Sequence, residues 1–320
     1  MGRRKLKPVD SLQSPRFAGI TTFGRLPHLR QLTDVHAAFL GIPFDDGTTF
    51  RPGARFGPKA VREASLLLRP YNPVLKVAPF EVLGVVDYGD VDVVPGYIED
   101  TYARIQTTLA ELAARKVIPL ICGGDHSITL PVLRALRARH GRLSLLHIDA
   151  HTDCWDEYFG RKYNHGTVFR RALEEDLVEP TNSVHVGIRG PVYFERDYEL
   201  VKGMGYHLIT MEEIREKGLP SILERVKGIL GAHVYVSFDI DACDPSVAPG
   251  TGIPEVGGFL AHEALQLLRS LVGINIVGLD VVEVSPPYDH GNITSVLASN
   301  LIYEGLCVIA CNFLAGSRRP

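Results

Sequence analysis

The stretch LSLLHIDAHTD, residues 143–153, changes character halfway along its length. Its first half, up to Ile148, is a continuous apolar run of the kind found in a strand that is buried on both faces. Two acids and a histidine then occupy alternate positions: Asp149, His151 and Asp153. Because alternate side chains of extended backbone point to one face, these three groups share a face where the strand ends.

Similar apolar runs recur along the chain, and stretches with helical periodicity lie between most of them. The apolar runs are His36–Leu40, Val82–Val86, Val117–Ile121, Leu143–Ile148, Ser183–Gly187, His207–Thr210, His233–Phe238 and Ile274–Leu279. The helical stretches are Lys59–Leu68, Tyr102–Arg115, Ile128–His140, Pro220–Leu230 and His262–Leu271. Continuous apolar strands that alternate with amphipathic helices predict a parallel sheet covered on both faces. We therefore predict an α/β fold, a single-domain three-layer sandwich with a mostly parallel sheet of about eight strands. Residues 31–320 are expected to form this domain, preceded by an N-terminal arm of residues 1–30.

Composition and charge indicate which binding partners and which cell compartment to expect. The formal net charge of −3 provides no basic surplus for binding nucleic acid or an anionic membrane. The basic run at residues 1–7 lacks the apolar segment of a secretory signal. Five cysteines without a CxxC pair indicate a reduced, cytoplasmic protein. The apolar stretch Ile293–Gly316 contains two asparagines and a glutamate, and we expect a buried C-terminal helix rather than a membrane span.

Three more apolar runs end in acids or histidine. GGDHS (123–127) follows one run, DID (239–241) follows another, and DVVE (280–283) follows a third. In parallel sheets, ligands bind beyond the carboxyl ends of the strands. We therefore expect these four ends, including the one at Asp149, to converge on one site.

Six residues from three of these ends form a candidate metal-ligating set: His126, Asp149, His151, Asp153, Asp239 and Asp241. Four clustered carboxylates repel one another unless cations neutralise them. Carboxylates with two imidazoles suit Mn(II), with Ni(II), Co(II) or Fe(II) as alternatives. Six ligands oversupply a single catalytic ion, so two ions bridged by carboxylates are expected. Each motif by itself is more typical of a turn or a cap, but all three together at strand ends indicate a metal site.

The motifs GGDHS, DAHTD (149–153) and SFDIDACDPSVAPGTGIPEVGG (237–258) resemble the signatures of the ureohydrolases, the arginase and agmatinase family. The likeness continues in GTTFRPGARFGPKAVR (47–62), NHGTVFRRALEEDLV (164–178) and VVEVSPPYDHGNIT (281–294), so it spans most of the chain. The segment RPGARFGP is more similar to the agmatinase, guanidinobutyrase and guanidinopropionase branch than to arginase itself. The resemblance implies the arginase/deacetylase-like fold and urea release at two Mn(II) ions, with Ni(II) in some relatives.

The resemblance also implies a role for each matching residue. The first metal would take His126, Asp149, Asp153 and Asp239, and the second would take Asp149, His151, Asp239 and Asp241. A metal-bridging hydroxide would attack the guanidinium carbon. His165 would then move a proton to the leaving amine, Glu283 would hold the guanidinium, and Asp153 would accept a hydrogen bond from the hydroxide. Family members commonly form trimers or hexamers, so a homo-oligomer is expected.

The substrate is expected to be a small cationic guanidino compound: agmatine, 4-guanidinobutanoate or 3-guanidinopropanoate. Guanidine or a small alkylguanidine is an alternative on the same site. Ile253 stands where the family usually has threonine, which removes a hydroxyl near the guanidinium. Trp155, the single tryptophan, follows Asp153 closely and is either a pocket wall or ordinary packing. For Arg189 we expect a structural ion pair, with contact to a substrate carboxylate as the alternative.

Two other classes of function stay open at this point. A related fold serves amide deacetylases that use a single zinc, although the presence of His151 and Asp241 argues against that reading. A non-catalytic, metal-stabilised regulatory subunit would keep the same ligands without turnover.

Overall fold

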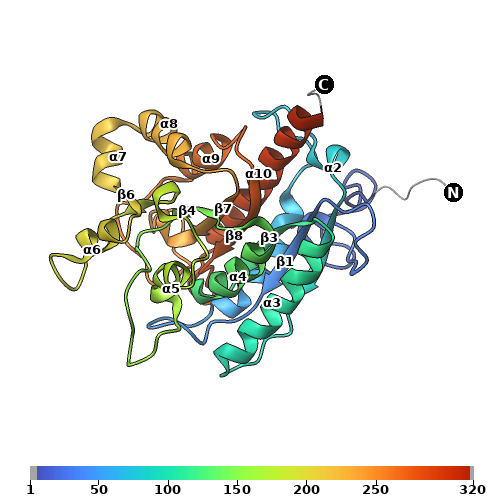
Figure 1. Cartoon of the computed structure of the whole chain (residues 1–320). Coiled ribbons are helices and arrows are strands. Elements are labelled where there is room, and N and C mark those ends of the chain that lie inside the picture. Colours follow the sequence, from blue (N-terminus) through green and yellow to red (C-terminus); the bar gives the residue numbers. More distant parts are fainter. Residues whose placement is uncertain (1–5, 318–320) are drawn as a thin grey trace.

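The computed structural model describes residues 6–317, so the first five residues of the expected arm and of the basic run lie outside it. Its centre is one sheet of eight parallel strands in the order β2-β1-β3-β8-β7-β4-β5-β6 (Figure 1). The strands are β1 Ala37–Ile42, β2 Val85–Asp90, β3 Ile118–Gly123, β4 Ser144–Ile148, β5 Val184–Ile188, β6 His207–Thr210, β7 Val234–Asp239 and β8 Ile276–Val282. The predicted fold class is confirmed.

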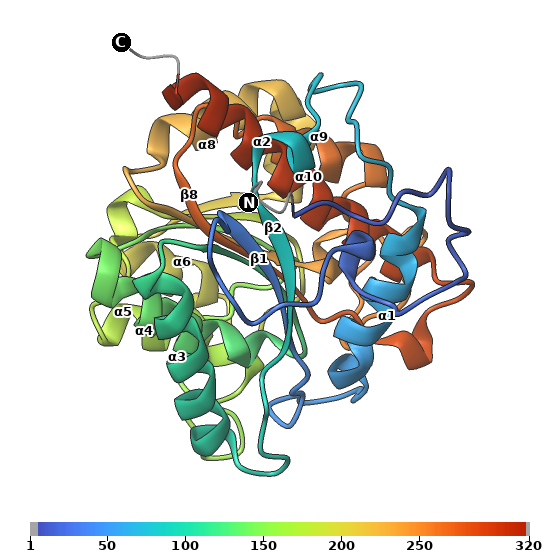
Figure 2. The same ribbon diagram turned by 90° about the vertical axis from the view of Figure 1, so that its right-hand side faces the viewer.

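Ten α-helices accompany the sheet in the described part of the chain. They are α1 Gly57–Ala64, α2 Pro79–Val82, α3 Ile98–Ala114, α4 Thr129–His140, α5 Val168–Glu174, α6 Asp197–Gly203, α7 Met211–Lys217, α8 Leu219–Ile229, α9 Ala261–Arg269 and α10 Ile293–Ser317. One apolar core cluster joins the sheet to α1, α2 and α7–α10, and the other joins it to α3–α6. The sheet is therefore covered on both faces, and the two views in Figures 1 and 2 show these layers.

The C-terminal helix α10 is the most apolar element. By length and composition it could cross a membrane, but 83% of its most apolar window is buried inside the protein. It packs against α1, α2, α9 and β8. The expectation of a buried C-terminal helix agrees with this packing.

The segment before β1 is attached to the domain. The ring of Phe23 stacks on Phe39 of β1, with centroids 4.5 Å apart and planes 6° apart. The Phe23 backbone N–H donates to Asp87 Oδ2 of β2 over 2.8 Å, and Arg62 of α1 donates to both oxygens of that carboxylate. The segment is thus held to the edge of the sheet by a buried carboxylate, and the division at residue 30 stays a prediction.

Candidate metal centre

The carboxyl ends of β3, β8, β7 and β4, four neighbouring strands, converge on one site. His126 lies in the short 3₁₀ turn after β3, Asp239 is the last residue of β7, and Asp241 lies in the turn that follows. Asp149 comes directly after β4, and His151 and Asp153 continue that loop. The structure thus brings all six predicted ligands together. All six side chains are largely buried.

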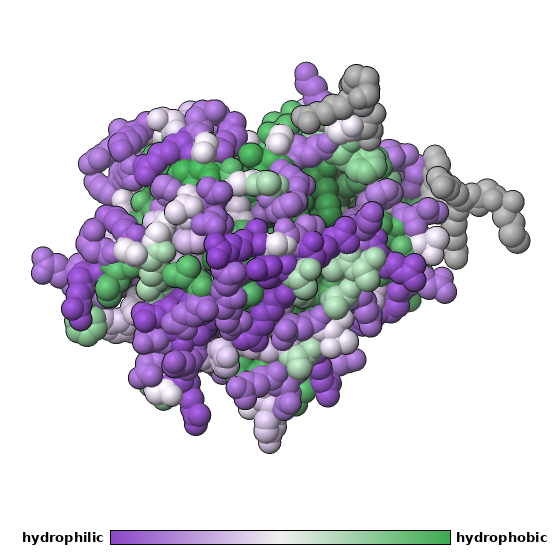
Figure 3. All heavy atoms as spheres, viewed as in Figure 1, coloured by the Kyte–Doolittle hydropathy of each residue, from purple (hydrophilic) through white to green (hydrophobic). Residues whose placement is uncertain are grey.

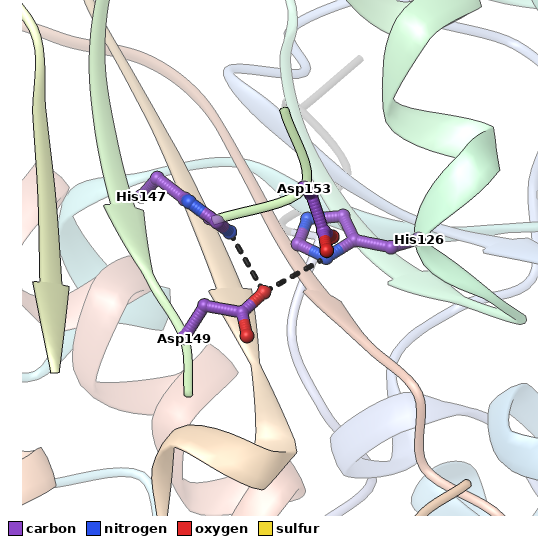
Figure 4. Close-up of side chains that lie close together, drawn as sticks. All are labelled: His126, His147, Asp149 and Asp153. Carbon is purple, nitrogen blue, oxygen red and sulfur yellow. Dashed lines mark hydrogen bonds and ion pairs between the residues drawn. The ribbon is translucent and has the colours of Figure 1, made fainter. Parts of the chain in front are cut away.

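His126 directs one ring nitrogen at three carboxylates. Its Nδ1 lies 3.2 Å from Asp149 Oδ2, 3.0 Å from Asp153 Oδ2 and 3.1 Å from Asp239 Oδ2. Figure 4 shows the His126 ring beside Asp149 and Asp153. One N–H cannot satisfy three carboxylates, whereas a cation among them would be shared by all four donor atoms.

Asp149 faces two groups at once. Its Oδ2 lies near His126, and its Oδ1 lies 3.4 Å from His151 Nδ1. The same His151 nitrogen is 3.2 Å from Asp241 Oδ2. Asp149 therefore occupies the position that a bridging carboxylate would need. Asp239 directs Oδ2 at His126, while its Oδ1 accepts the Asp241 backbone N–H over 2.9 Å, so its bridging role stays a prediction.

The ionisation of the cluster shows how strongly these groups interact. Burial raises the pKa of Asp239 well above its usual range, and the charges of Asp241 and Asp149 raise it further. Burial and Asp149 likewise raise the pKa of Asp241 to about 6. Burial lowers the pKa of His126, but its carboxylate neighbours outweigh burial and hold it well above the ordinary value. Without metal the cluster takes up protons to reduce its negative charge, and this donor set therefore fits divalent cations.

Ser237 and Asp280 determine which nitrogen of His126 carries a proton. Ser237 Oγ donates to Asp280 Oδ1 over 2.7 Å, so it accepts from His126 Nε2 at 2.8 Å. Neutral His126 therefore has its proton on Nε2 and its lone pair on Nδ1, directed at the carboxylates. Thr129 and Tyr235 also donate hydroxyl hydrogen bonds to Asp280, each over 2.6 Å. Sequence reasoning gave Asp280 no role of its own, although it follows an apolar run as the other acids do.

His147, a residue of strand β4 to which the sequence analysis assigned no role, contacts the candidate ligands. Its Nε2 lies 2.8 Å from Asp149 Oδ2, as Figure 4 shows, and its Nδ1 lies 2.7 Å from His185 Nδ1. It thus orients the Asp149 carboxylate from within strand β4. The alternation that marks Asp149, His151 and Asp153 already begins at residue 147, and that register was the available signal.

His165 and Glu283 form a pair beside the metal-ligand cluster. His165 Nδ1 lies 2.9 Å from Glu283 Oε1, and that oxygen also accepts the His126 backbone N–H over 2.9 Å. Glu283 Oε2 is buried and has no hydrogen-bond partner among the described residues. The Glu283 backbone is left-handed, with φ of 63°, which is uncommon outside glycine and occurs at functional sites.

Burial lowers the pKa of His165, but the Glu283 hydrogen bond and charge outweigh burial and raise it to about 9. Neutral His165 accepts the Thr49 N–H at Nε2 over 3.1 Å, and protonated His165 donates to Thr49 Oγ1 at 2.8 Å. Both protonation states therefore have partners. Asp125 lies close by, and burial together with Glu283 raises its pKa to about 7. Thr49 and Asp125 lie in the motifs GTTFRPGARFGPKAVR and GGDHS but were given no role there, because neither motif shows which loop residues approach His165.

A cavity of about 290 Å³ opens onto these groups. Its acidic lining residues are Asp153, Asp239, Asp241, Glu255 and Glu283, and His151 and His165 also line it. Ile253 and Trp155 form part of its wall. Both positions that sequence analysis connected with substrate contacts therefore lie at the cavity.

The structural ion pair expected for Arg189 is wrong. Its guanidinium donates to six backbone carbonyl oxygens, those of Gly187, Asp241, Ala242, Cys243, Glu255 and Val256. Among the described residues it pairs with no carboxylate. Arg189 instead joins the loop after β7 to the loop that carries Glu255, and its donors are already used.

Comparison with known proteins places these observations in a family. A model of the arginase family matches residues 35–307. The guanidinobutyrase of Pseudomonas aeruginosa is 42% identical over 97% of this chain and 98% of its own length, and the guanidinopropionase of the same organism is 44% identical over 95% and 96%. The solved structure of proclavaminate amidinohydrolase from Streptomyces clavuligerus has a TM-score of 0.89 at 41% identity and covers 93% of this chain and 100% of its own.

Proposed function

The chain belongs to the arginase family, and on that premise we propose that it hydrolyses the guanidino group of a small linear guanidino compound to urea and an amine. The candidate substrates are agmatine, 4-guanidinobutanoate and 3-guanidinopropanoate. The observation that carries the proposal is the His165–Glu283 pair, because it shares one cavity with the ligand cluster. An acid that can hold a guanidinium and a histidine that can move a proton thus lie beside a metal-ligating set.

His126, Asp149, Asp153 and Asp239 would hold one cation, and Asp149, His151, Asp239 and Asp241 would hold the other. We propose two Mn(II) ions, with Ni(II) as the alternative, because the ligands are mainly carboxylates with two imidazoles. When bound, such ions supply an activated water at neutral pH. The chain's part is to fix the donors, which it does through Ser237, Asp280 and His147.

Glu283 would bind the substrate guanidinium with Oε2, its oxygen without a partner, because a carboxylate and a guanidinium match in charge and hydrogen-bonding geometry. His165 shares its Nδ1 proton with Glu283 and can carry a second proton on Nε2 beside Thr49. That proton is available to the departing amine, which must gain one to leave. Asp153 lines the same cavity and can accept a proton from the attacking water.

A urea-release assay on protein loaded with Mn(II) or Ni(II) tests this function. It should cover agmatine, 4-guanidinobutanoate, 3-guanidinopropanoate, arginine, guanidine and methylguanidine. Urea from at least one of them is the expected result. Acetyl-lysine turnover with one zinc per chain and no urea would instead indicate a deacetylase, and bound metal without any turnover would indicate a regulatory subunit.

The variant His126→Ala tests the ligand assignment. It should lose one metal equivalent in elemental analysis and nearly all urea release, while its circular dichroism spectrum stays that of the folded protein. Near-normal urea release would show that the ligand set is wrong. Replacing His207, which lies on the edge strand β6 away from the cavity, is a matched control.

We further propose a cytoplasmic homo-oligomer, a trimer or hexamer. Support for the compartment comes from the cysteines, because all five are free thiols and four of them are buried. Support for assembly comes from large apolar side chains that stay exposed near the end of α10, Phe313 and Leu314. Light scattering of the purified protein distinguishes a monomer from either assembly.

A further inference from the structure

Three aromatic rings form an open box on the cavity wall: Trp155, Tyr158 and Tyr193. The ring centroids of Trp155 are 5.9 Å from those of Tyr158 and Tyr193, and the two tyrosines are 6.1 Å apart. Each pair of planes is steeply inclined, at 69°, 76° and 65°. Rings that meet at steep angles present their faces in different directions, so a cation that lies over them can contact more than one face.

Local backbone structure holds the box in place. Tyr158 and Arg161 exchange both backbone hydrogen bonds, at 3.0 and 2.8 Å, around a tight turn with two residues at positive φ. The Trp155 N–H donates to the carbonyl of Gly166 over 3.1 Å. A Cβ on Gly166 would lie 2.8 Å from a ring carbon of Tyr158, so glycine is needed for this close approach. These contacts fix the loop that carries Trp155 and Tyr158.

The charges around the box are negative. Five acidic residues line the cavity, whereas none of its lining residues is lysine or arginine. Arg189, the nearby candidate for a carboxylate contact, uses its donors on backbone carbonyls. Counting Asp149, six carboxylates balance two divalent cations, the substrate guanidinium and a protonated His165, so the filled site offers no surplus of positive charge. A carboxylate on the far end of the substrate would meet no opposite charge here.

Glu255 connects the box to the catalytic end of the cavity. It lines the same cavity, and its carboxylate lies 3.6 Å from His151 Nε2. Aromatic faces attract cations through their negative electrostatic potential, and a carboxylate elsewhere in the same cavity adds to that attraction.

We propose that Trp155, Tyr158 and Tyr193 bind a cationic alkylammonium group at the distal end of the substrate, with Glu255 adding its negative charge from the same cavity. The preferred substrate is then a dication of the agmatine type, not a guanidino acid of the kind named for the relatives in Pseudomonas aeruginosa. This inference rests on the proposed guanidino hydrolysis and specifies which end group the site selects.

Three substrates of similar length isolate the effect of the end group: agmatine with a positive end, N-butylguanidine with a neutral end and 4-guanidinobutanoate with a negative end. The metal-loaded protein should rank them in that order in kcat/KM, with at least about tenfold between the first and the last. Trp155→Leu and Tyr193→Leu should each lower kcat/KM for agmatine severalfold, and by a larger factor than kcat/KM for N-butylguanidine. Phe194→Leu is the matched control, because Phe194 is 65% exposed beside Tyr193, which is 66% exposed, but does not line the cavity.

Trp155 is the only tryptophan, so its fluorescence reports directly on the box. Agmatine should change the emission at concentrations where 4-guanidinobutanoate does not. Equal or better hydrolysis of 4-guanidinobutanoate, or an unchanged agmatine preference in both box variants, would overturn the inference while leaving guanidino hydrolysis intact. Urea release from none of the compounds would instead overturn the proposed function. Melting curves of the two variants show whether any loss comes from misfolding.

Discussion

His165 is a buried histidine whose charge depends on one carboxylate. Burial alone would keep it neutral, but Glu283 Oε1 at 2.9 Å raises its pKa to about 9. The same Glu283 oxygen accepts the backbone N–H of His126. A proton on His165 therefore strengthens a contact that joins the loop at residue 165 to the ends of β3 and β8.

This pKa shift predicts a pH dependence of stability in the metal-free protein. The folded-state pKa lies above the unfolded value, so the stabilisation is complete below about pH 6.5 and is lost as the pH rises through about 9. By that linkage it amounts to at most about 3 kcal/mol. The difference in free energy of unfolding between wild type and His165→Asn should narrow from pH 6 to pH 9.5, measured by urea denaturation in a chelator. A constant difference would contradict the shifted pKa.

Ser237→Ala should weaken metal binding without removing a ligand. It deletes the hydroxyl that accepts from His126 Nε2 and so frees the ring to change tautomer or turn. Changes to such supporting groups cost about 10- to 100-fold in metal affinity, and competition with a chromogenic chelator would measure it. Ser299→Ala is a suitable control, because Ser299 is also buried but lies in α10 and bonds only a helix carbonyl.

At the scale of elements, the site depends on β8 lying between β3 and β7. The register aligns Asp280 of β8 with Ser237 of β7 and with Ile121 of β3. Asp280 thereby reaches Ser237 and Tyr235 on one neighbouring strand and Thr129 at the start of α4. A buried carboxylate with three hydroxyl donors thus joins three elements and supports His126.

Asp280→Asn should therefore destabilise the fold. The amide NH₂ cannot accept the hydroxyl hydrogen bonds that a carboxylate oxygen accepts, so donors are left unsatisfied in the core. We expect a loss of about 2–4 kcal/mol in the free energy of unfolding, measured by denaturant titration. The exposed Asp92→Asn should change stability by less than about 0.5 kcal/mol. Similar values for both variants would contradict the role assigned to Asp280.

The sequence predicted the elements whose signal is long or repeated. All eight strands appear within a few residues of their apolar runs, because strands buried on both faces lack polar interruptions. Helices α2, α5, α6 and α7 were missed because four to seven residues are too few to establish a helical period. β8 extends to Val282, past the expected end, because three hydroxyls allow Asp280 to continue the buried strand.

The candidate site likewise contains some residues that the sequence could identify and some that it could not. The six candidate ligands could be found because they occur as spaced motifs at strand ends, and the structure brings them together. Thr49 and Tyr193 could not, since their positions depend on loops that pack only in three dimensions, and Asp125, although it lies in GGDHS, owes its role to contacts that the motif does not show. The prediction for Arg189 was wrong because its partners are backbone carbonyls, which every residue has and which the sequence therefore cannot identify.

At the scale of the whole molecule, the negative charges of the carboxylate cluster repel one another inside a well-packed fold. Its surface, by contrast, is mostly polar on the face shown in Figure 3, with smaller apolar patches between. The pKa of Asp239 is raised by burial and by its acidic neighbours, so an uncompensated negative charge there opposes folding.

Chelation should therefore lower the melting temperature. A ligand present at 100 times its dissociation constant stabilises a fold by about 2.7 kcal/mol, which corresponds to about 4 °C for a chain of this length. Asp239→Asn should lose most of this response, and without metal it should melt no lower than the wild type, because it removes a repelling charge. Differential scanning calorimetry with Mn(II) and with a chelator measures both. If the wild-type melting temperature were the same with Mn(II) and with a chelator, the cluster would bind no stabilising ion.

The position of β8 also affects how the chain folds during its synthesis. The strands on its two sides form separate groups, β2-β1-β3 and β7-β4-β5-β6, and β8 alone hydrogen-bonds to both. Because β8 follows the other seven strands in the sequence, any half-sheet that forms during synthesis keeps an open edge at β3 or β7 until residue 282 has emerged. Such edges pair readily with other chains. The insertion of one late strand thus ends the period of greatest exposure to aggregation, and only then do Asp280 and Glu283 reach the groups they hold in place.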